Sequence, residues 1–327
     1  MMRKKVFAAR ICAAGLAMLM AAPVHVYAEN AGPGGGASAQ SGRTIYAPGV
    51  KAGPGAAAGA DSTSEMKTNT SAVPARPRKT AEELQAAMAS VPAGPAKAEW
   101  GTFFLGNNLP PRNDEDEAYL RSFHAYAMVP TEEKVAYLTF DEGYENGYTP
   151  AILDVLAKHK VKAAFFCTGS FVKESPELVK RFAEEGHIIG NHTLTHPSMM
   201  KVDNWAEFSR QLLSVEDLVK GITGVDMPRY YRPPAGAYSE AQLKMADAFG
   251  FKTIFWSVAY KDWDPNDQPS REKAMNYLTT RIHPGAIILM HAVSKTNAEI
   301  MDELLTTWES MGYTFKTLDE LPEGLTQ

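Results

Sequence analysis

Hydrophobic and polar positions follow two different periods along residues 135–317. Short apolar runs rich in β-branched and aromatic residues alternate with longer stretches whose apolar residues recur every three or four positions. The longer stretches predict helices; residues 175–186, for example, open on Ser175-Pro176-Glu177 and end at Gly186. The short runs predict seven strands, at residues 135–140, 162–167, 187–191, 229–231, 252–258, 286–290 and 313–317.

Strands that alternate with helices in this way are typical of parallel β/α units. The runs "AAFF" and "AIILM" are apolar at every position, as expected for strands that are covered on both faces. We therefore predict an α/β fold, a distorted seven-stranded (β/α) barrel over residues 135–324, with an open doubly wound sheet as the alternative. Residues 80–134 are expected to form an N-terminal lead-in segment that packs on the barrel.

The first 79 residues have a different composition. Residues 1–28 carry four cations and no acid ahead of an apolar run, and Val26-Tyr27-Ala28 suits cleavage, so they predict a secretory signal peptide. An uncleaved anchor is the alternative, although the run is shorter than the roughly 18 apolar residues of a spanning helix. Residues 29–79 are rich in Ala, Gly, Pro, Ser and Thr and predict a disordered linker. We expect an exported protein of the cell envelope or the extracellular space, without a transmembrane helix once the signal is removed.

Charge and cysteine content argue against a nucleic-acid-binding protein and against a protein stabilised by disulfides. Removal of residues 1–28 takes the formal net charge from −5 to about −9, and such acidity disfavours nucleic acid as a partner. Cys12 lies in the signal peptide, so Cys167 alone remains and no internal disulfide can form. We expect a monomer that is stabilised by its core.

Polar side chains follow the predicted strands at their carboxyl ends, where parallel β/α folds build their sites. Taken singly, each has a structural explanation, such as a surface ion pair, a loop cap or a core histidine. Their recurrence at one edge of the sheet indicates a catalytic site instead. The residues are Asp141, Glu142, His192, His196, Arg232, Asp262, Trp263 and His291.

The sequence "HTLTH" is a candidate metal site. His192 and His196 are four residues apart, so on a helical turn both imidazoles can reach one cation. Two imidazoles and the carboxylate of Glu142 would make a three-ligand site with open positions, which is the catalytic arrangement. Zinc suits this set best, and cobalt, iron and nickel are alternatives.

Five motifs carry a family resemblance. "TFDEG", "HTLTH", "RPPAG", "DW" and "LMH", in this order, resemble the motifs of the polysaccharide deacetylases, the NodB-homology carbohydrate esterases. The stretches "TFDEGYENGYTPAILDVL", "GHIIGNHTLTHP" and "HAVSKTNAE" resemble the branch of delta-lactam-biosynthetic de-N-acetylases. The resemblance covers about residues 100–324 and implies a distorted (β/α) barrel. It also implies metal-dependent removal of the N-acetyl group of N-acetylmuramic acid in peptidoglycan, which forms the muramic delta-lactam of the spore cortex during sporulation, between forespore and mother cell.

The resemblance assigns a role to each matching residue. Asp141 is similar to the catalytic base, Arg232 to the cation that pairs with it, and His291 to the general acid. Asp262 would hold His291 in its cationic form. The metal ligands implied are His192, His196 and Glu142, and the substrate groove would be lined by Pro234, Tyr238 and Trp263.

One departure from the family pattern bears on the metal. The usual motif has Asp where this chain has Glu142, whose carboxylate lies one methylene farther out, and Glu145 is a substitute ligand. The branch resembled also varies at this position, and Ala259 replaces an acid that many relatives carry.

Two other functions remain open. One is an N-acetylglucosamine or chitin deacetylase, or a xylan esterase; the other is a catalytically silent module that binds glycan. The presence of Asp141, Arg232, Asp262 and His291 together favours an enzyme over a silent module.

Overall fold

A computed structural model describes residues 96–113, 115–202 and 204–323. The predicted signal peptide, the predicted linker and the first part of the lead-in segment lie outside these residues. Within the described ranges, no helix combines the length and the apolar character that crossing a membrane requires.

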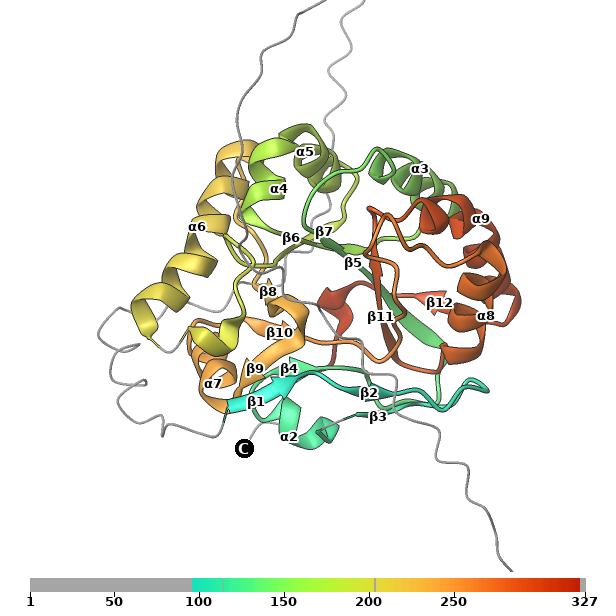
Figure 1. The fold of residues 1–327 in the computed structure, drawn as a ribbon, viewed down its shortest axis with the longest axis horizontal. Helices are drawn as coiled ribbons and strands as arrows, with labels where there is room; N and C mark the ends of the chain where they lie inside the picture. Colours follow the sequence, from blue (N-terminus) through green and yellow to red (C-terminus); the bar gives the residue numbers. More distant parts are fainter. Residues whose placement is uncertain (1–95, 114, 203, 324–327) are drawn as a thin grey trace, which may run out of the picture.

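A curled parallel sheet forms the centre of the molecule (Figure 1). β12 (Thr314–Phe315) pairs with the first residues of β5 (Val135–Glu142), and β6 (Ala164–Cys167) pairs with the last four residues of β5. Bridges from Met128 to Ala286 and from Val258 to Ile288 join the two ends of the sheet, which therefore closes into a distorted barrel. The predicted fold is confirmed, and each of the seven predicted strands has a counterpart in the eight-stranded sheet, whose remaining strand was not predicted. The strand order is β11 (Ala286–His291), β5 (Val135–Glu142), β6 (Ala164–Cys167), β7 (Ile188–Asn191), β8 (Tyr230–Tyr231), β10 (Lys252–Ile254) and β4 (Ala125–Tyr126).

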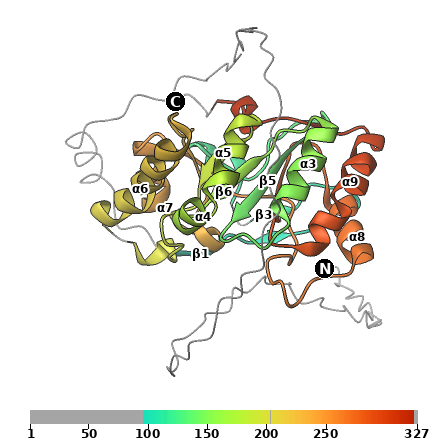
Figure 2. The same cartoon turned by 90° about the horizontal axis from the view of Figure 1, so that it is seen from above.

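Helices cover the outside of the sheet. Figure 2 shows β5 and β6 between α6 (Trp205–Thr223) and α7 (Glu240–Ala248) on one side and α8 (Arg271–Arg281) and α9 (Lys295–Ser310) on the other. Several helices begin at a side-chain cap; Ser294, for example, accepts the backbone N–H of Asn297 at the start of α9. The helices are α2 (Glu117–Arg121), α3 (Thr149–His159), α4 (Gly169–Glu174), α5 (Pro176–Glu184), α6 (Trp205–Thr223), α7 (Glu240–Ala248), α8 (Arg271–Arg281) and α9 (Lys295–Ser310), with 3-10 turns η1 (Met199–Lys201), η2 (Pro234–Gly236) and η3 (Leu318–Glu320).

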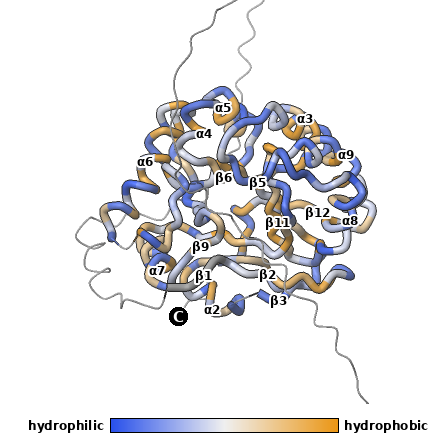
Figure 3. The backbone as a smooth tube through the Cα atoms, viewed as in Figure 1, coloured by the Kyte–Doolittle hydropathy of each residue, from blue (hydrophilic) through white to orange (hydrophobic). Residues whose placement is uncertain are grey.

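The two faces of β5 belong to different apolar layers, because successive side chains of a strand point to opposite faces. Leu138 and Phe140 pack with residues of the covering helices, whereas Tyr137 packs inside the barrel with residues such as Phe166 and Ile287. In Figure 3, β11 is coloured as hydrophobic, while the surrounding helices alternate between hydrophilic and hydrophobic residues. Odd-numbered residues of β5 therefore face the interior of the barrel and even-numbered residues face the helices.

The lead-in segment contributes strands that the hydrophobic pattern did not predict. β4 pairs with β10 inside the main sheet, β1 (Ala96–Glu99) pairs with β9 (Ala237–Ser239), and β2 (Thr102–Phe103) pairs with β3 (Arg112–Asn113). Trp100 anchors the segment: its ring stacks on Phe255 at 4.7 Å, and its Nε1 donates to the Trp256 carbonyl at 2.9 Å. The lead-in is therefore tied directly to the end of β10.

Candidate active site

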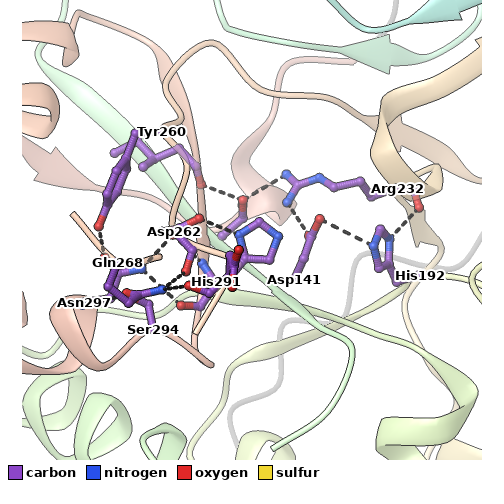
Figure 4. A network of polar contacts seen from close by, with 12 residues as sticks. Asp141, His192, Arg232, Tyr260, Asp262, Gln268, His291, Ser294 and Asn297 are labelled. Atoms are coloured by element: carbon purple, nitrogen blue, oxygen red, sulfur yellow. Dashed lines mark hydrogen bonds and ion pairs between the residues drawn. The ribbon is translucent and has the colours of Figure 1, made fainter. Parts of the chain in front are cut away.

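The candidate site lies where β5, β8 and β11 end (Figure 4). Asp141 and His291 are register partners on the neighbouring parallel strands β5 and β11. Both lie at the carboxyl end of the sheet, as the sequence predicted. Asp141 is an odd-numbered residue of β5, so its side chain points into the barrel, as that of Thr139 does.

The Arg232 guanidinium holds Asp141. Nη1 of Arg232 donates to Oδ1 of Asp141 at 2.7 Å, and both side chains are buried. The guanidinium is itself fixed: Nη2 donates to the Thr139 hydroxyl at 2.8 Å, and Nε donates to the Ile254 carbonyl at 3.0 Å. Its Cζ also lies 4.2 Å from the ring centroid of Phe166. A buried cation bound on so many sides can place the carboxylate in only one position.

His192 faces the other carboxylate oxygen. Its Nδ1 donates to the Arg232 carbonyl at 2.9 Å, since a carbonyl can only accept, and its Nε2 lies 3.5 Å from Oδ2 of Asp141. The neutral ring therefore turns an unprotonated Nε2 toward the site. The ring of His196 lies beside it, with centroids 4.8 Å apart. A tight turn brings the two together, because Thr193 and His196 have positive φ angles of 70° and 53°.

His291 is held by Asp262. The Nδ1–H of His291 donates to Oδ1 of Asp262 at 2.7 Å, and its backbone N–H donates to Oδ2 at 2.9 Å. Asp262 is fully buried. This pairing fixes the tautomer and leaves Nε2 of His291 as the nitrogen available to a ligand.

The charges of the site are set by burial and by neighbours. Burial alone would raise the pKa of Asp141, but the charges of Arg232, His192 and His291 hold it below its usual range. Burial lowers the pKa of His192 to about 4, so this ring is neutral. The pKa of His196 is also lowered by desolvation, although that residue is exposed at the surface. Burial opposes the charged form of His291 as well, yet the carboxylates of Asp262 and Asp141 raise its pKa above the usual value. The surroundings therefore favour the anionic form of Asp141 and the cationic form of His291 at one site.

Glu142 does not join the two histidines. Strand β5 continues to Glu142, two residues beyond the predicted end, so the side chain points to the helix-facing side, beside its register partner Cys167. It is fully buried, neither carboxylate oxygen has a hydrogen-bond partner among the described residues, and burial followed by the charge of Glu145 raises its pKa well above the usual value. The part of the chain that the structure describes contains no group of three or more His, Cys, Asp or Glu residues that could hold a metal ion. Of the three predicted ligands, His192 and His196 thus lie side by side, whereas Glu142 lies on the other face of β5.

The three residues predicted to line a substrate groove differ in exposure. Tyr238 is only 2% exposed, and its ring packs against those of Trp100 and Phe255, so it is not open to a sugar. Pro234 is buried in η2. Trp263 is partly exposed, and the Nζ of Lys261 lies 5.3 Å from its ring centroid. Trp263 is therefore the one of the three whose ring a ligand can reach.

Three comparisons relate this chain to known proteins. The sequence model of the polysaccharide deacetylase family matches residues 128–254. Over 223 residues the chain is 44% identical to the peptidoglycan-N-acetylmuramic acid deacetylase PdaA of Bacillus subtilis. The matched region covers 68% of this chain and 84% of the relative. It is 39% identical over 209 residues to the peptidoglycan-N-acetylglucosamine deacetylase PgdA of Listeria monocytogenes, covering 63% of this chain and 43% of that one. The solved structure of B. subtilis PdaA, a family 4 carbohydrate esterase, superposes with a TM-score of 0.65 over 68% of this chain and 95% of its own.

Proposed function

Because this chain belongs to the polysaccharide deacetylase family of hydrolases, we propose that it removes the N-acetyl group from N-acetylmuramic acid in peptidoglycan. The relative that is 44% identical over most of its own length is named for this activity. An exported protein of the cell envelope would meet this substrate, and formation of the muramic delta-lactam in the spore cortex, between forespore and mother cell, is the process in which we place it.

The observation that carries the chemistry is the pairing of an anionic Asp141 with a cationic His291 at one strand edge. Amide hydrolysis needs a base for the attacking water and an acid for the departing nitrogen. We assign the first role to Asp141, which Arg232 keeps ionised, and the second to His291, which Asp262 keeps protonated.

The reaction then proceeds in two steps. Asp141 takes a proton from a water molecule as the water oxygen bonds to the acetyl carbon. The C–N bond breaks as Nε2 of His291 gives its proton to the departing nitrogen, because an amine anion is a poor leaving group. Acetate and a free amino sugar are the products, and the proton held by Asp141 returns His291 to its cationic form through solvent.

We further propose that a divalent metal, zinc in the first instance, is held by His192 and His196. The two rings beside each other support this assignment, and Glu142 is not included because its side chain lies on the other face of β5. When bound there, a divalent metal supplies Lewis acidity to the water and to the acetyl carbonyl. In the partly exposed Trp263 we see a surface on which a sugar ring can stack.

The test is acetate release by the purified full-length chain from peptidoglycan that lacks stem peptides. Mass spectrometry of the digested glycan then identifies the sugar that lost its acetyl group. We expect deacetylated muramic acid; loss of acetate from N-acetylglucosamine alone would replace the proposed substrate with the one for which the Listeria relative is named. Absence of acetate from every acetylated glycan, with Asp141→Asn equally inert, would favour a silent binding module.

A further inference from the structure

The pair formed by Asp262 and His291 continues into a buried chain of polar side chains (Figure 4). Nδ2 of Asn297 donates to Oδ2 of Asp262 at 2.7 Å and to the His291 carbonyl at 3.0 Å. Oδ1 of Asn297 accepts from the hydroxyl of Tyr260. Asn297 is fully buried, so these bonds are made within the protein and not exchanged with bulk water.

The Asn297 amide has one workable orientation. Its nitrogen faces two acceptors and its oxygen faces one donor, so a flip would place the amide oxygen against the Asp262 carboxylate. Oδ2 of Asp262 accepts from Asn297 and from the His291 backbone, which leaves Oδ1 for the His291 ring. The Asp262 carboxylate therefore cannot rotate without breaking the bonds that Asn297 supplies.

The backbone around this chain is also tied. The Asn297 N–H donates to the Ser294 hydroxyl at 3.1 Å, and that hydroxyl donates to Oε1 of Gln268 at 2.5 Å. Nε2 of Gln268 then donates to the Asp262 carbonyl at 2.8 Å. These bonds join the first turn of α9 to the loop that follows β10, and Asn297 takes part in both the side-chain and the backbone connections.

We propose that Asn297 is a positioning residue for the deacetylation reaction, oriented by Tyr260 and acting through Asp262 to hold the His291 ring with Nε2 toward the substrate. The proposal rests on the function assigned above to His291. The charged groups that face His291 are Asp262, Asp141 and Arg232. Asp262 is the one that bonds the ring directly, so its placement determines how the ring is oriented. Removal of Asn297 would free Asp262 to turn and would leave the ring less well aligned for proton donation.

The kinetic test compares Asn297→Ala with Tyr260→Phe, and uses Asn276→Ala, on the exposed side of α8, as a control. We expect kcat on peptide-free peptidoglycan to fall about 10- to 100-fold in Asn297→Ala and about 3- to 10-fold in Tyr260→Phe, since bonds to charged groups are the stronger ones. KM should stay within about twofold, because both side chains are buried and bonded within the protein. Unchanged kcat in both variants, with an active wild type, would overturn the proposal.

A second readout follows the His291–Asp262 hydrogen bond without substrate. Its Nδ1–H proton should give a low-field NMR resonance that is assigned by its loss in His291→Gln. We expect the resonance to disappear or move upfield in Asn297→Ala and to persist in Asn276→Ala. Persistence in Asn297→Ala with unchanged position would overturn the proposal even if kcat falls.

Two further outcomes are informative. If Asn297→Ala does not fold, as judged by circular dichroism, the Tyr260→Phe variant decides the question, because it removes one hydroxyl and keeps the ring. If the wild type is inactive on all glycans, the proposed function fails, and the resonance alone then supports or overturns the positioning role of Asn297.

Discussion

Asp141 and His291 are register partners on adjacent parallel strands, and each has a separate partner that fixes its charge. Arg232 pairs with Asp141 and Asp262 pairs with His291, so the carboxylate and the imidazolium do not neutralise each other within one hydrogen bond. A base and an acid of opposite charge are thus available to a single bound amide.

We predict a bell-shaped dependence of kcat/KM on pH. The pKa of Asp141 is below its usual value of about 3.9, so the acid limb should lie below roughly pH 4. The pKa of His291 is above its usual value of about 6.5, so activity should fall only as the pH rises past that value and the ring loses its proton. In Asp262→Asn the alkaline limb should move to lower pH and kcat should drop by about 10³-fold or more, as for other Asp–His pairs. An alkaline limb that stays in place would contradict the role of Asp262.

Arg232 is expected to contribute to stability through Asp141. Replacement by Met leaves the Asp141 carboxylate buried without its cation and should cost about 3–5 kcal/mol in the free energy of unfolding, measured with urea. Adding Asp141→Asn should recover part of this loss, because the uncompensated charge is then gone. Equal stability of the single and the double variant would show that the pair is not coupled.

Metal binding should depend on His192 and His196 and not on Glu142. The zinc affinity of the metal-free protein can be measured by isothermal titration calorimetry. The affinity of Glu142→Gln should lie within about tenfold of wild type, whereas that of His192→Ala should fall about 100-fold or more. Chelation should abolish acetate release and zinc should restore it. Weak zinc binding in Glu142→Gln would return Glu142 to the ligand set.

Gly285 should not tolerate a side chain. Its φ is +74°, and an added Cβ would lie 1.8 Å from the Val129 carbonyl oxygen, where the end of the β4 segment meets β11. Gly285→Ala should therefore destabilise the protein by more than about 3 kcal/mol or prevent folding. Gly221→Ala in α6 is the matched control. Apart from its chain neighbours and the backbone of its own helix, no described atom lies within 4 Å of the added Cβ, and stability should stay equal or rise by up to about 1 kcal/mol. Similar thermal midpoints for the two variants would contradict the expectation.

The hydrophobic pattern predicted seven strands because each belongs to the alternation of apolar runs and helical stretches over residues 135–317, even where the strand itself, as in β8 and β12, has only two residues. It did not predict β4, β1 or β2, since these short strands lie in the lead-in segment, outside that alternation, and depend on their partners. Trp100 and Asn297 were missed for a related reason. Their contacts reach Trp256 and Asp262, far away in the sequence, and only the folded chain brings these residues together.

The residues of the candidate site that follow from where strands end could be predicted from the sequence. The orientation of Glu142, which depends on how far β5 extends, could not. Asp141, Arg232, Asp262 and His291 meet as expected because parallel strands end at one edge. The Glu142 ligand was expected from a strand that ends at Phe140, whereas β5 runs through Glu142 and turns its side chain to the opposite face. One or two residues of strand length therefore decide whether a carboxylate faces the barrel or the helices.

The placement of β4 has a consequence for how this enzyme is delimited. The strand comes from the lead-in segment, yet it covers the edge of β10 with parallel hydrogen bonds. A fragment that starts at Val135 would leave that edge open, with its N–H and C=O groups free to pair with another molecule. Such a fragment should aggregate. The minimal catalytic fragment that stays in solution therefore begins upstream of the motifs by which the family is identified.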